Sequence, residues 1–230
     1  MRVLNVKPVC VRLSRLSDVQ LVLLIRHGRA DYKPGHLYGW TPGVHLSSEG
    51  REEVKRLAER LENVKLNAIY SSPLERCHET AEALVEGRRL EIQTEDDLGE
   101  VRYGKWQGKS FRTLVKTPLW RTVQLVPSQA TFPGGESLLE LQRRGVQAIE
   151  TIRTRHKKGV IAVVSHADMI KALAAHYLGM HLDLFQRINV DPASVTALSF
   201  MGAFPRLLRI GDTGDYDGLR PPKPQAKKKR

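Results

Sequence analysis

Apolar and polar positions along the chain alternate between short apolar runs and longer segments with helical spacing. The two clearest apolar runs cover residues 20–25 and 159–164 and are typical of buried strands. Weaker strand patterns cover residues 68–70, 90–94, 194–200 and 206–210. Gly202 and Pro205 are expected to join the last two. The strand segments therefore recur throughout the body of the chain.

Helical spacing fills most of the intervals between these strands. Apolar residues three and four apart predict helices over about 48–61 and 136–156, and another after 159–164 that reaches about Leu178. The long middle helix should place on one apolar face Leu139, Val146, Ile149 and Ile152. Alternating strands and helices favour an α/β fold, a three-layer α/β/α sandwich with a mostly parallel central sheet.

Two segments look like helix starts. In Ser72-Pro73-Leu74-Glu75, Ser72 can cap, Pro73 suits the first helical position and Glu75 completes a capping box. Ser165, with Asp168 three residues later, is a second candidate cap. Both starts come directly after predicted strands.

Length and composition indicate a soluble protein with one folded domain. The chain has 230 residues, 41% hydrophobic and 27% charged, as expected of a soluble globular protein. No apolar stretch approaches the roughly 20 residues needed to cross a bilayer. We expect one catalytic domain over residues 20–212, preceded by an N-terminal extension, 1–19, and followed by a disordered basic tail, 213–230.

The net charge of +12 lies mainly at the two ends of the chain. Residues 220–230 carry +6 and residues 1–20 carry +3, so the body is only mildly basic. The basic end is better explained as a solvated tail than as an anchor for nucleic acid or acidic surfaces. Cys10 and Cys77 show no metal-ligand spacing and give a disulfide no support, so the expected location is the cytoplasm.

Chemistry-bearing residues stand at three strand-to-helix junctions. Arg26 and His27 follow the first strand, Arg76 follows the second, and His166 follows the strand 159–164. Because the carboxyl ends of parallel strands meet at one edge of a sheet, these side chains should converge on one crevice. Arginine forks and helix N-termini suit phosphate. The residues alone predict a phosphate site, although arginine is also common in surface ion pairs and a lone histidine is more often structural.

Five motifs in order resemble the histidine phosphatase superfamily, in its phosphoglycerate-mutase-like branch. They are Arg26-His27-Gly28, Ser71-Ser72-Pro73-Leu74-Glu75-Arg76, Glu100 in Leu-Gly-Glu-Val-Arg-Tyr-Gly, Phe132-Pro133-Gly134-Gly135-Glu136-Ser137 and Ser165-His166-Ala167-Asp168. The order matches from about residue 21 to 200. Together the motifs are far more specific than any one of them.

The resemblance implies a role for each of the catalytic candidates. His27 would be the nucleophile that becomes phosphohistidine, and Arg26, Arg76 and His166 would hold the phosphoryl group. Glu100 would protonate the leaving oxygen, for which its pKa should be raised. Nearby acids compete for this last role by position: Glu95, Asp96 and Asp97.

Three further residues are expected to bind substrate: Arg29, Trp40 and Ala167. Trp40 is equally suited to packing. The resemblance implies no metal and no other cofactor, and Gly134-Gly135 lacks the spacing of a nucleotide-binding loop.

Departures from the mutase pattern favour water as the phosphoryl acceptor. Mutases of this branch typically follow Arg-His-Gly with Glu or Gln and Ser, and place Arg directly after the catalytic Glu. Here Arg29-Ala30-Asp31-Tyr32 follows Gly28, and Val101 follows Glu100. The span from Glu100 to His166 also looks short for the insertion that closes a mutase site.

The expected function is therefore a phosphomonoesterase that hydrolyses small phosphorylated metabolites through phosphohistidine. Two alternatives stay open: a cofactor-dependent phosphoglycerate mutase, and a non-catalytic module that binds phosphorylated ligands. The expected partner is a small-molecule phosphate ester, with no membrane or nucleic acid, and an exposed sheet edge could support a homodimer.

Overall fold

The computed structural model describes residues 19–202 and 204–214, so nearly all of the predicted extension and of the basic tail lies outside the described residues. The strands are β1 (Gln20–Arg26), β2 (Leu66–Ser71), β3 (Ile92–Thr94), β4 (Gly159–Ser165), β5 (Val195–Met201) and β6 (Phe204–Asp212). The helices are α1 (Ser48–Arg60), α2 (Glu75–Val85), α3 (Phe111–Leu114), α4 (Pro118–Leu125), α5 (Leu138–Arg155) and α6 (Ala167–Tyr177). Short 3-10 turns lie between several of them, including Asp96–Leu98.

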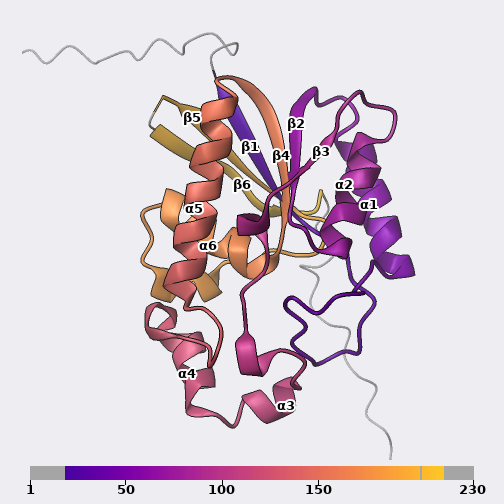
Figure 1. The fold of residues 1–230 in the computed structure, drawn as a ribbon. Coiled ribbons are helices and arrows are strands. Elements are labelled where there is room, and N and C mark those ends of the chain that lie inside the picture. Colours follow the sequence, from indigo (N-terminus) through magenta and orange to yellow (C-terminus); the bar gives the residue numbers. More distant parts are fainter. Residues whose placement is uncertain (1–18, 203, 215–230) are drawn as a thin grey trace, which may run out of the picture.

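The six strands form one sheet in the order β3-β2-β4-β1-β5-β6 (Figure 1). β1 to β4 are mutually parallel where they pair, whereas β5 runs antiparallel to both β1 and β6. The apolar runs predicted as buried strands are the two central strands, β1 and β4, as expected for strands covered on both faces. The prediction of a mostly parallel sheet is confirmed.

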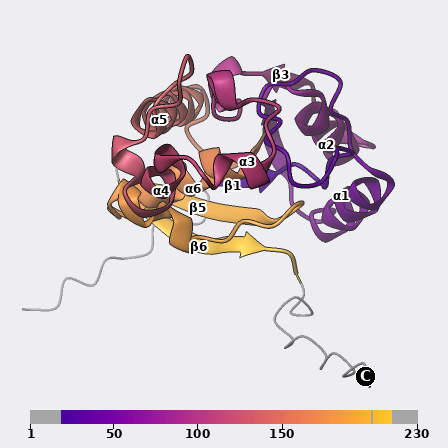
Figure 2. The same cartoon turned by 90° about the horizontal axis from the view of Figure 1, so that it is seen from below.

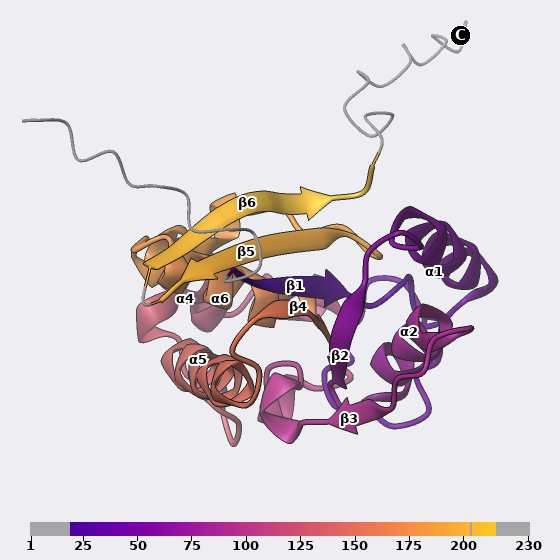
Figure 3. The same ribbon diagram turned by 90° about the horizontal axis from the view of Figure 1, so that it is seen from above.

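Helices cover both faces of the sheet (Figure 3). On one face, Leu57 of α1 and Leu84 of α2 pack against Ile25 and Ile69. On the other, a larger cluster joins residues of α5 and α6 to β1, β4 and β5, among them Val22, Ile149, Val163, Leu173 and Leu198. The three-layer α/β/α arrangement predicted from the alternating pattern is confirmed.

Both predicted helix starts differ in detail from the structure. α2 begins at Glu75, and Leu74 occupies the cap position without a side-chain cap hydrogen bond. The predicted capping box is therefore wrong, because Ser72 is buried beside His166 and the Glu75 carboxylate accepts from Gly43 N. Ser165 is not a cap either: it donates to Leu98 O, and His166 takes the cap position of α6.

Three smaller expectations also need correction. Leu139 is exposed on α5 rather than part of its apolar face, because the buried positions of that helix follow Leu138 and Leu141. The third strand begins at Ile92 rather than at residue 90. Pro205 lies within β6, paired with Phe200, which an edge strand tolerates because its outer amides need no partner.

Candidate active site

The structure brings the four predicted junction residues together at one edge of the sheet. Arg26 and His27 lie at the end of β1, Arg76 in the first turn of α2, and His166 at the N-cap of α6. In Figure 1, β1 and β4 run downward, toward the part of the molecule that holds α3 and the loop that follows β1. The imidazole rings of His27 and His166 are 5.2 Å apart between centroids. The four residues meet because the parallel strands that precede them end at the same edge of the sheet.

Hydrogen bonding determines the tautomer of His27. Its Nδ1 lies 2.7 Å from Gly28 O, and because a carbonyl can only accept, Nδ1 carries the proton. Nε2 then presents a lone pair, 3.3 Å from the donating Nε of Arg76. Burial lowers the pKa of His27 well below its usual value, and Arg76 and Arg26 lower it further. The imidazole is held neutral, as a nucleophile must be.

The two arginines leave buried donors without protein partners. Arg26 donates from Nη1 to Val190 O and Arg76 from Nη2 to Gly39 O, at 2.7 and 2.9 Å. Among the described residues, however, Arg26 Nε and Arg76 Nη1 are buried and find no acceptor. Unsatisfied buried charged donors are costly, so a pair of them beside one cavity indicates that an anion completes the site.

His166 is held in the complementary tautomer. Arg76 Nη2 donates to its Nδ1 at 3.2 Å, so Nε2 carries the proton and donates to Ser72 Oγ at 2.8 Å. Burial lowers the pKa of His166 well below its usual value, and Arg76 lowers it further. Cys77 is buried 3.4 Å from the same Nε2, and burial raises the pKa of its thiol to about 12, which leaves it unreactive.

Glu100 is the acid of its segment that reaches the cleft. It lines the cavity with Arg26, His27 and Arg76, whereas Glu95, Asp96 and Asp97 do not. Its Oε1 accepts from Val101 N at 2.9 Å. Burial, and after it the charge of Asp168, raises the pKa of Glu100 to about 7. A carboxyl that is partly protonated near neutrality is suited to general acid catalysis.

The loop that carries Glu100 is held by a residue that the sequence analysis missed. From α5, Arg144 donates to the carbonyls of Asp97, Gly99 and Glu100 and pairs with Glu136 at 2.7 Å. Both partners of this ion pair are largely buried, at 13% and 11% side-chain exposure. Glu136 falls within one of the five motifs, but nothing local marks Arg144 as a support of this loop, since the loop carbonyls that it binds are 44 to 47 residues away.

Replacing Arg144 by methionine should therefore destabilise the fold. The change leaves the carbonyls of Asp97 and Gly99 without this donor and removes one donor each from Glu100 O and the Glu136 carboxylate. The loss should lower the free energy of unfolding by about 2–4 kcal/mol. Urea unfolding checks this, with Arg143→Met at the exposed neighbouring position as the control. A loss no larger than that of the control would contradict the assigned role.

The three additional substrate-binding candidates do not line the cleft. Arg29 is exposed and pairs with Glu53 of α1. Trp40 donates from its indole to Glu100 O, and the Arg102 guanidinium lies 4.2 Å from its ring centroid. Ala167 is the first residue of α6. Trp40 thus contacts the acid's loop rather than the cavity, and Arg102 is directed to Trp40.

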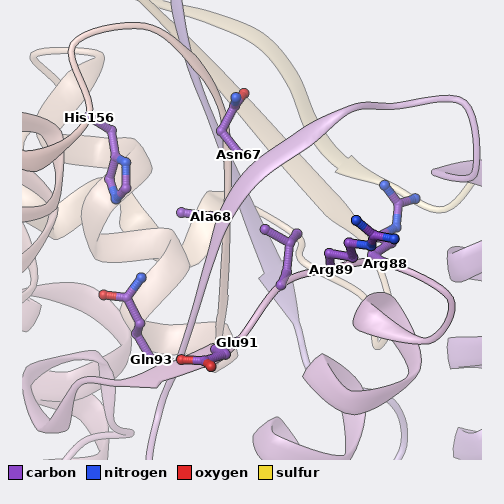
Figure 4. A pocket seen from close by; sticks show the side chains of 8 residues that line it. Asn67, Ala68, Arg88, Arg89, Glu91, Gln93 and His156 are labelled. Atoms are coloured by element: carbon purple, nitrogen blue, oxygen red, sulfur yellow. The ribbon is translucent and has the colours of Figure 1, made fainter.

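A second and larger cavity opens at the other end of the sheet (Figure 4). Its lining comes from the start of β2, from β3 and the segment before it, and from the C-cap of α5: Asn67, Ala68, Arg88, Arg89, Leu90, Glu91, Gln93 and His156. Arg88 is already bound to the carbonyls of Val64 and Leu61. This cavity lies away from the carboxyl ends of the strands and from both active-site histidines.

Within residues 19–202 and 204–214, no helix is long and apolar enough to span a membrane. The same residues hold no cluster of three or more His, Cys, Asp or Glu side chains arranged to bind a metal ion.

The site combines a neutral histidine, two guanidinium groups with buried donors and a carboxyl of raised pKa, and groups of these kinds suit phosphoryl transfer. The sequence pattern of the histidine phosphatase superfamily (branch 1) matches residues 22–213, and the chain belongs to that superfamily.

Relatives of known name include hydrolases and a mutase. Phosphoserine phosphatase 1 of Hydrogenobacter thermophilus is 32% identical over 77% of this chain and 85% of its own length. The 2,3-bisphosphoglycerate-dependent phosphoglycerate mutase of Thermoplasma acidophilum is 25% identical over 88% of this chain and 97% of its own length. Among solved structures, Bacillus stearothermophilus YhfR superposes with a TM-score of 0.80 at 28% identity, covering 84% of this chain and 97% of that one.

Proposed function

We propose that this protein is a metal-independent phosphomonoesterase that forms phosphohistidine at Nε2 of His27. The observation that carries the proposal is a pair of guanidinium donors, Arg26 Nε and Arg76 Nη1, that have no partner among the described residues and belong to side chains lining the same cavity as His27. They supply an anion site where a phosphate would meet a lone pair. The site residues His27, Arg26, Arg76, His166 and Glu100 are proposed in the roles that the family resemblance implies.

In the first step, His27 Nε2 attacks phosphorus and the bond from phosphorus to the ester oxygen breaks. Glu100 gives its proton to that oxygen, so the alcohol leaves neutral. Arg26 and Arg76 hold the phosphoryl oxygens and stabilise the charge that they carry in the transition state. When phosphate binds, the hydrogen bond between Arg76 and His166 can break so that both side chains turn to the anion.

In the second step, water replaces the alcohol. Glu100, now ionised, takes a proton from water while the water oxygen bonds to phosphorus and the phosphorus–nitrogen bond breaks. Inorganic phosphate leaves, and both His27 and Glu100 return to their starting protonation states. One group serves as acid and then as base, which a pKa near the working pH permits.

The choice of water over a second alcohol rests on the sequence departures from the mutase pattern. Arg29, which replaces the acidic or amide residue of mutases, is directed to Glu53 and not to the cleft. The relatives include both phosphatases and a mutase, so the mutase alternative is tested directly in the experiment below. A cytoplasmic location and a homodimer stay predictions from cysteine usage and from the sheet edge.

The test combines phosphate release with trapping of the intermediate. The full chain, incubated with p-nitrophenyl phosphate and EDTA, should release inorganic phosphate and form an acid-labile, base-stable phosphoenzyme. Isomerisation of 3-phosphoglycerate in the presence of 2,3-bisphosphoglycerate at a rate above hydrolysis would establish the mutase alternative. Binding of phosphate esters without any phosphoenzyme would establish the non-catalytic alternative.

A further inference from the structure

The active-site cleft has a second group of lining residues besides those proposed to bind phosphate and transfer protons. Beyond the groups assigned to phosphate and to proton transfer, the lining side chains are aromatic or aliphatic, with one imidazole. They are Tyr32, His36, Leu37, Tyr38, Val44, Tyr103 and Phe111. None of these residues is Lys, Arg, Asp or Glu. The part of a substrate beyond the phosphate therefore meets rings and apolar surface.

Two of these rings are partly open to solvent. Tyr32 and Phe111 are 38% and 37% exposed, although both are large hydrophobic side chains. The rings of Tyr32 and Tyr38 lie 4.9 Å apart between centroids with their planes tilted by 31°. Exposed aromatic surface beside a cleft is typical of a ligand-binding wall.

Two segments build this wall, and backbone hydrogen bonds tie them together. Phe111 N donates to Gly35 O at 2.7 Å, and Leu37 N donates to Lys109 O at 2.9 Å. Gly108 N in turn donates to Leu37 O. Figure 2 views the molecule from this end and shows α3 beside the loop that follows β1. The rings thus stand on a braced surface, which reduces the ordering cost of binding.

We infer that this aromatic wall, Tyr32, Tyr38 and Phe111, selects phosphate monoesters whose alcohol carries a ring or a bulky apolar group. The inference rests on the proposed function and names its substrate class. A ring on the substrate gains stacking contacts with the wall. A carboxylate at the same place would lose water without gaining a lysine or arginine among the lining residues, which is unfavourable.

The substrate class inferred here differs from the substrates that appear in the names of two relatives. Phosphoserine and phosphoglycerates carry a carboxylate close to the phosphate, and both appear in those names. A fixed cation beyond the phosphate pocket is the usual means of binding such a carboxylate. Here the fixed cations that line the cleft are the two arginines assigned to the phosphate. We therefore expect both carboxylated esters to be poor substrates.

The test compares esters with matched leaving groups, so that intrinsic reactivity does not decide the result. 2-Phenylethyl phosphate and ethyl phosphate are both esters of primary alcohols and differ by the ring. We expect kcat/KM of the ring ester to exceed that of ethyl phosphate, O-phosphoserine and 3-phosphoglycerate by about tenfold or more. A value for either carboxylated ester equal to or above that of the ring ester would overturn the inference.

Two independent variants locate the preference. Phe111→Ala and Tyr32→Ala should each move the ratio of kcat/KM for the ring ester over ethyl phosphate toward one. Phe111 also lies near Trp120, so its replacement could disturb packing outside the wall. Tyr32 contacts the ring of Tyr38, which belongs to the wall, and its replacement is therefore the second variant. Phe204→Ala, an exposed phenylalanine on edge strand β6, is the matched control and should leave the ratio unchanged. Unchanged ratios in both wall variants would refute the assignment.

Failure of the proposed function is distinguishable from failure of this inference. Absence of turnover and of phosphoenzyme with every ester would contradict the phosphatase, while calorimetric affinities would still test the wall. In that case the ring ester must bind about tenfold more tightly than ethyl phosphate, and equal affinities would overturn the inference.

Discussion

Replacement of His27 by alanine is expected to abolish turnover of every phosphate monoester, with kcat lowered on the order of 10⁴-fold or more. The variant removes the nitrogen that attacks phosphorus, and no neighbouring group can take its place. The thiol of Cys77 has its pKa raised to about 12, and His166 does not line the cavity that His27 lines. Steady-state phosphate release and phosphoenzyme trapping measure the loss.

The control for this change is another histidine outside the cleft. His78 lies on α2 next to Cys77 but faces Glu82, with which it pairs at 3.2 Å. His78→Ala should keep phosphoenzyme formation and turnover at the level of the unchanged protein. Hydrolysis by the His27 variant within tenfold of that level would rule out the phosphohistidine route.

Glu100→Gln is expected to remove most hydrolysis of alkyl phosphates, by about 10²–10⁴-fold, because the glutamine cannot protonate the leaving oxygen. The loss should be much smaller for p-nitrophenyl phosphate, whose leaving group departs as a stable anion. Comparing both esters separates a missing proton donor from a general distortion of the site. Glu95→Gln, in the same segment but outside the cleft, is the matched control.

The pH dependence of the unchanged protein should report the same group. The acid must be protonated in the free enzyme, and its pKa is raised to about 7, so kcat/KM for an alkyl ester should fall as pH rises above about 7. His27 must be neutral, and since its pKa is lowered, the limb that rises with pH should lie well below pH 6.5.

Ionisation of the substrate is shared by both proteins, so the comparison with Glu100→Gln isolates the enzyme's contribution. The descending limb near pH 7 should be absent from the variant. Its persistence there would assign the limb to another group.

Local sequence signals were sufficient where a feature depends on neighbouring residues. The apolar runs of β1 and β4 predicted buried strands, and the residues at their ends predicted the site. The same signals failed at Ser72 and Ser165, where a local cap was expected and a distant partner competes for the hydroxyl. Ser72 binds His166, which is 94 residues away. A side chain with two candidate partners cannot be assigned from one segment.

The sequence by itself determined the α/β layering and the convergence of Arg26, His27, Arg76 and His166, because strand periodicity and parallel strand ends are local and topological properties. The tertiary structure decided which nitrogen of each histidine carries the proton, which acid reaches the cleft and which other side chains line it. Those features depend on burial and on partners tens of residues away, such as Arg144 at the Glu100 loop and Gly35 at Phe111. Protonation follows from the environment of a group, and only the folded chain supplies that environment.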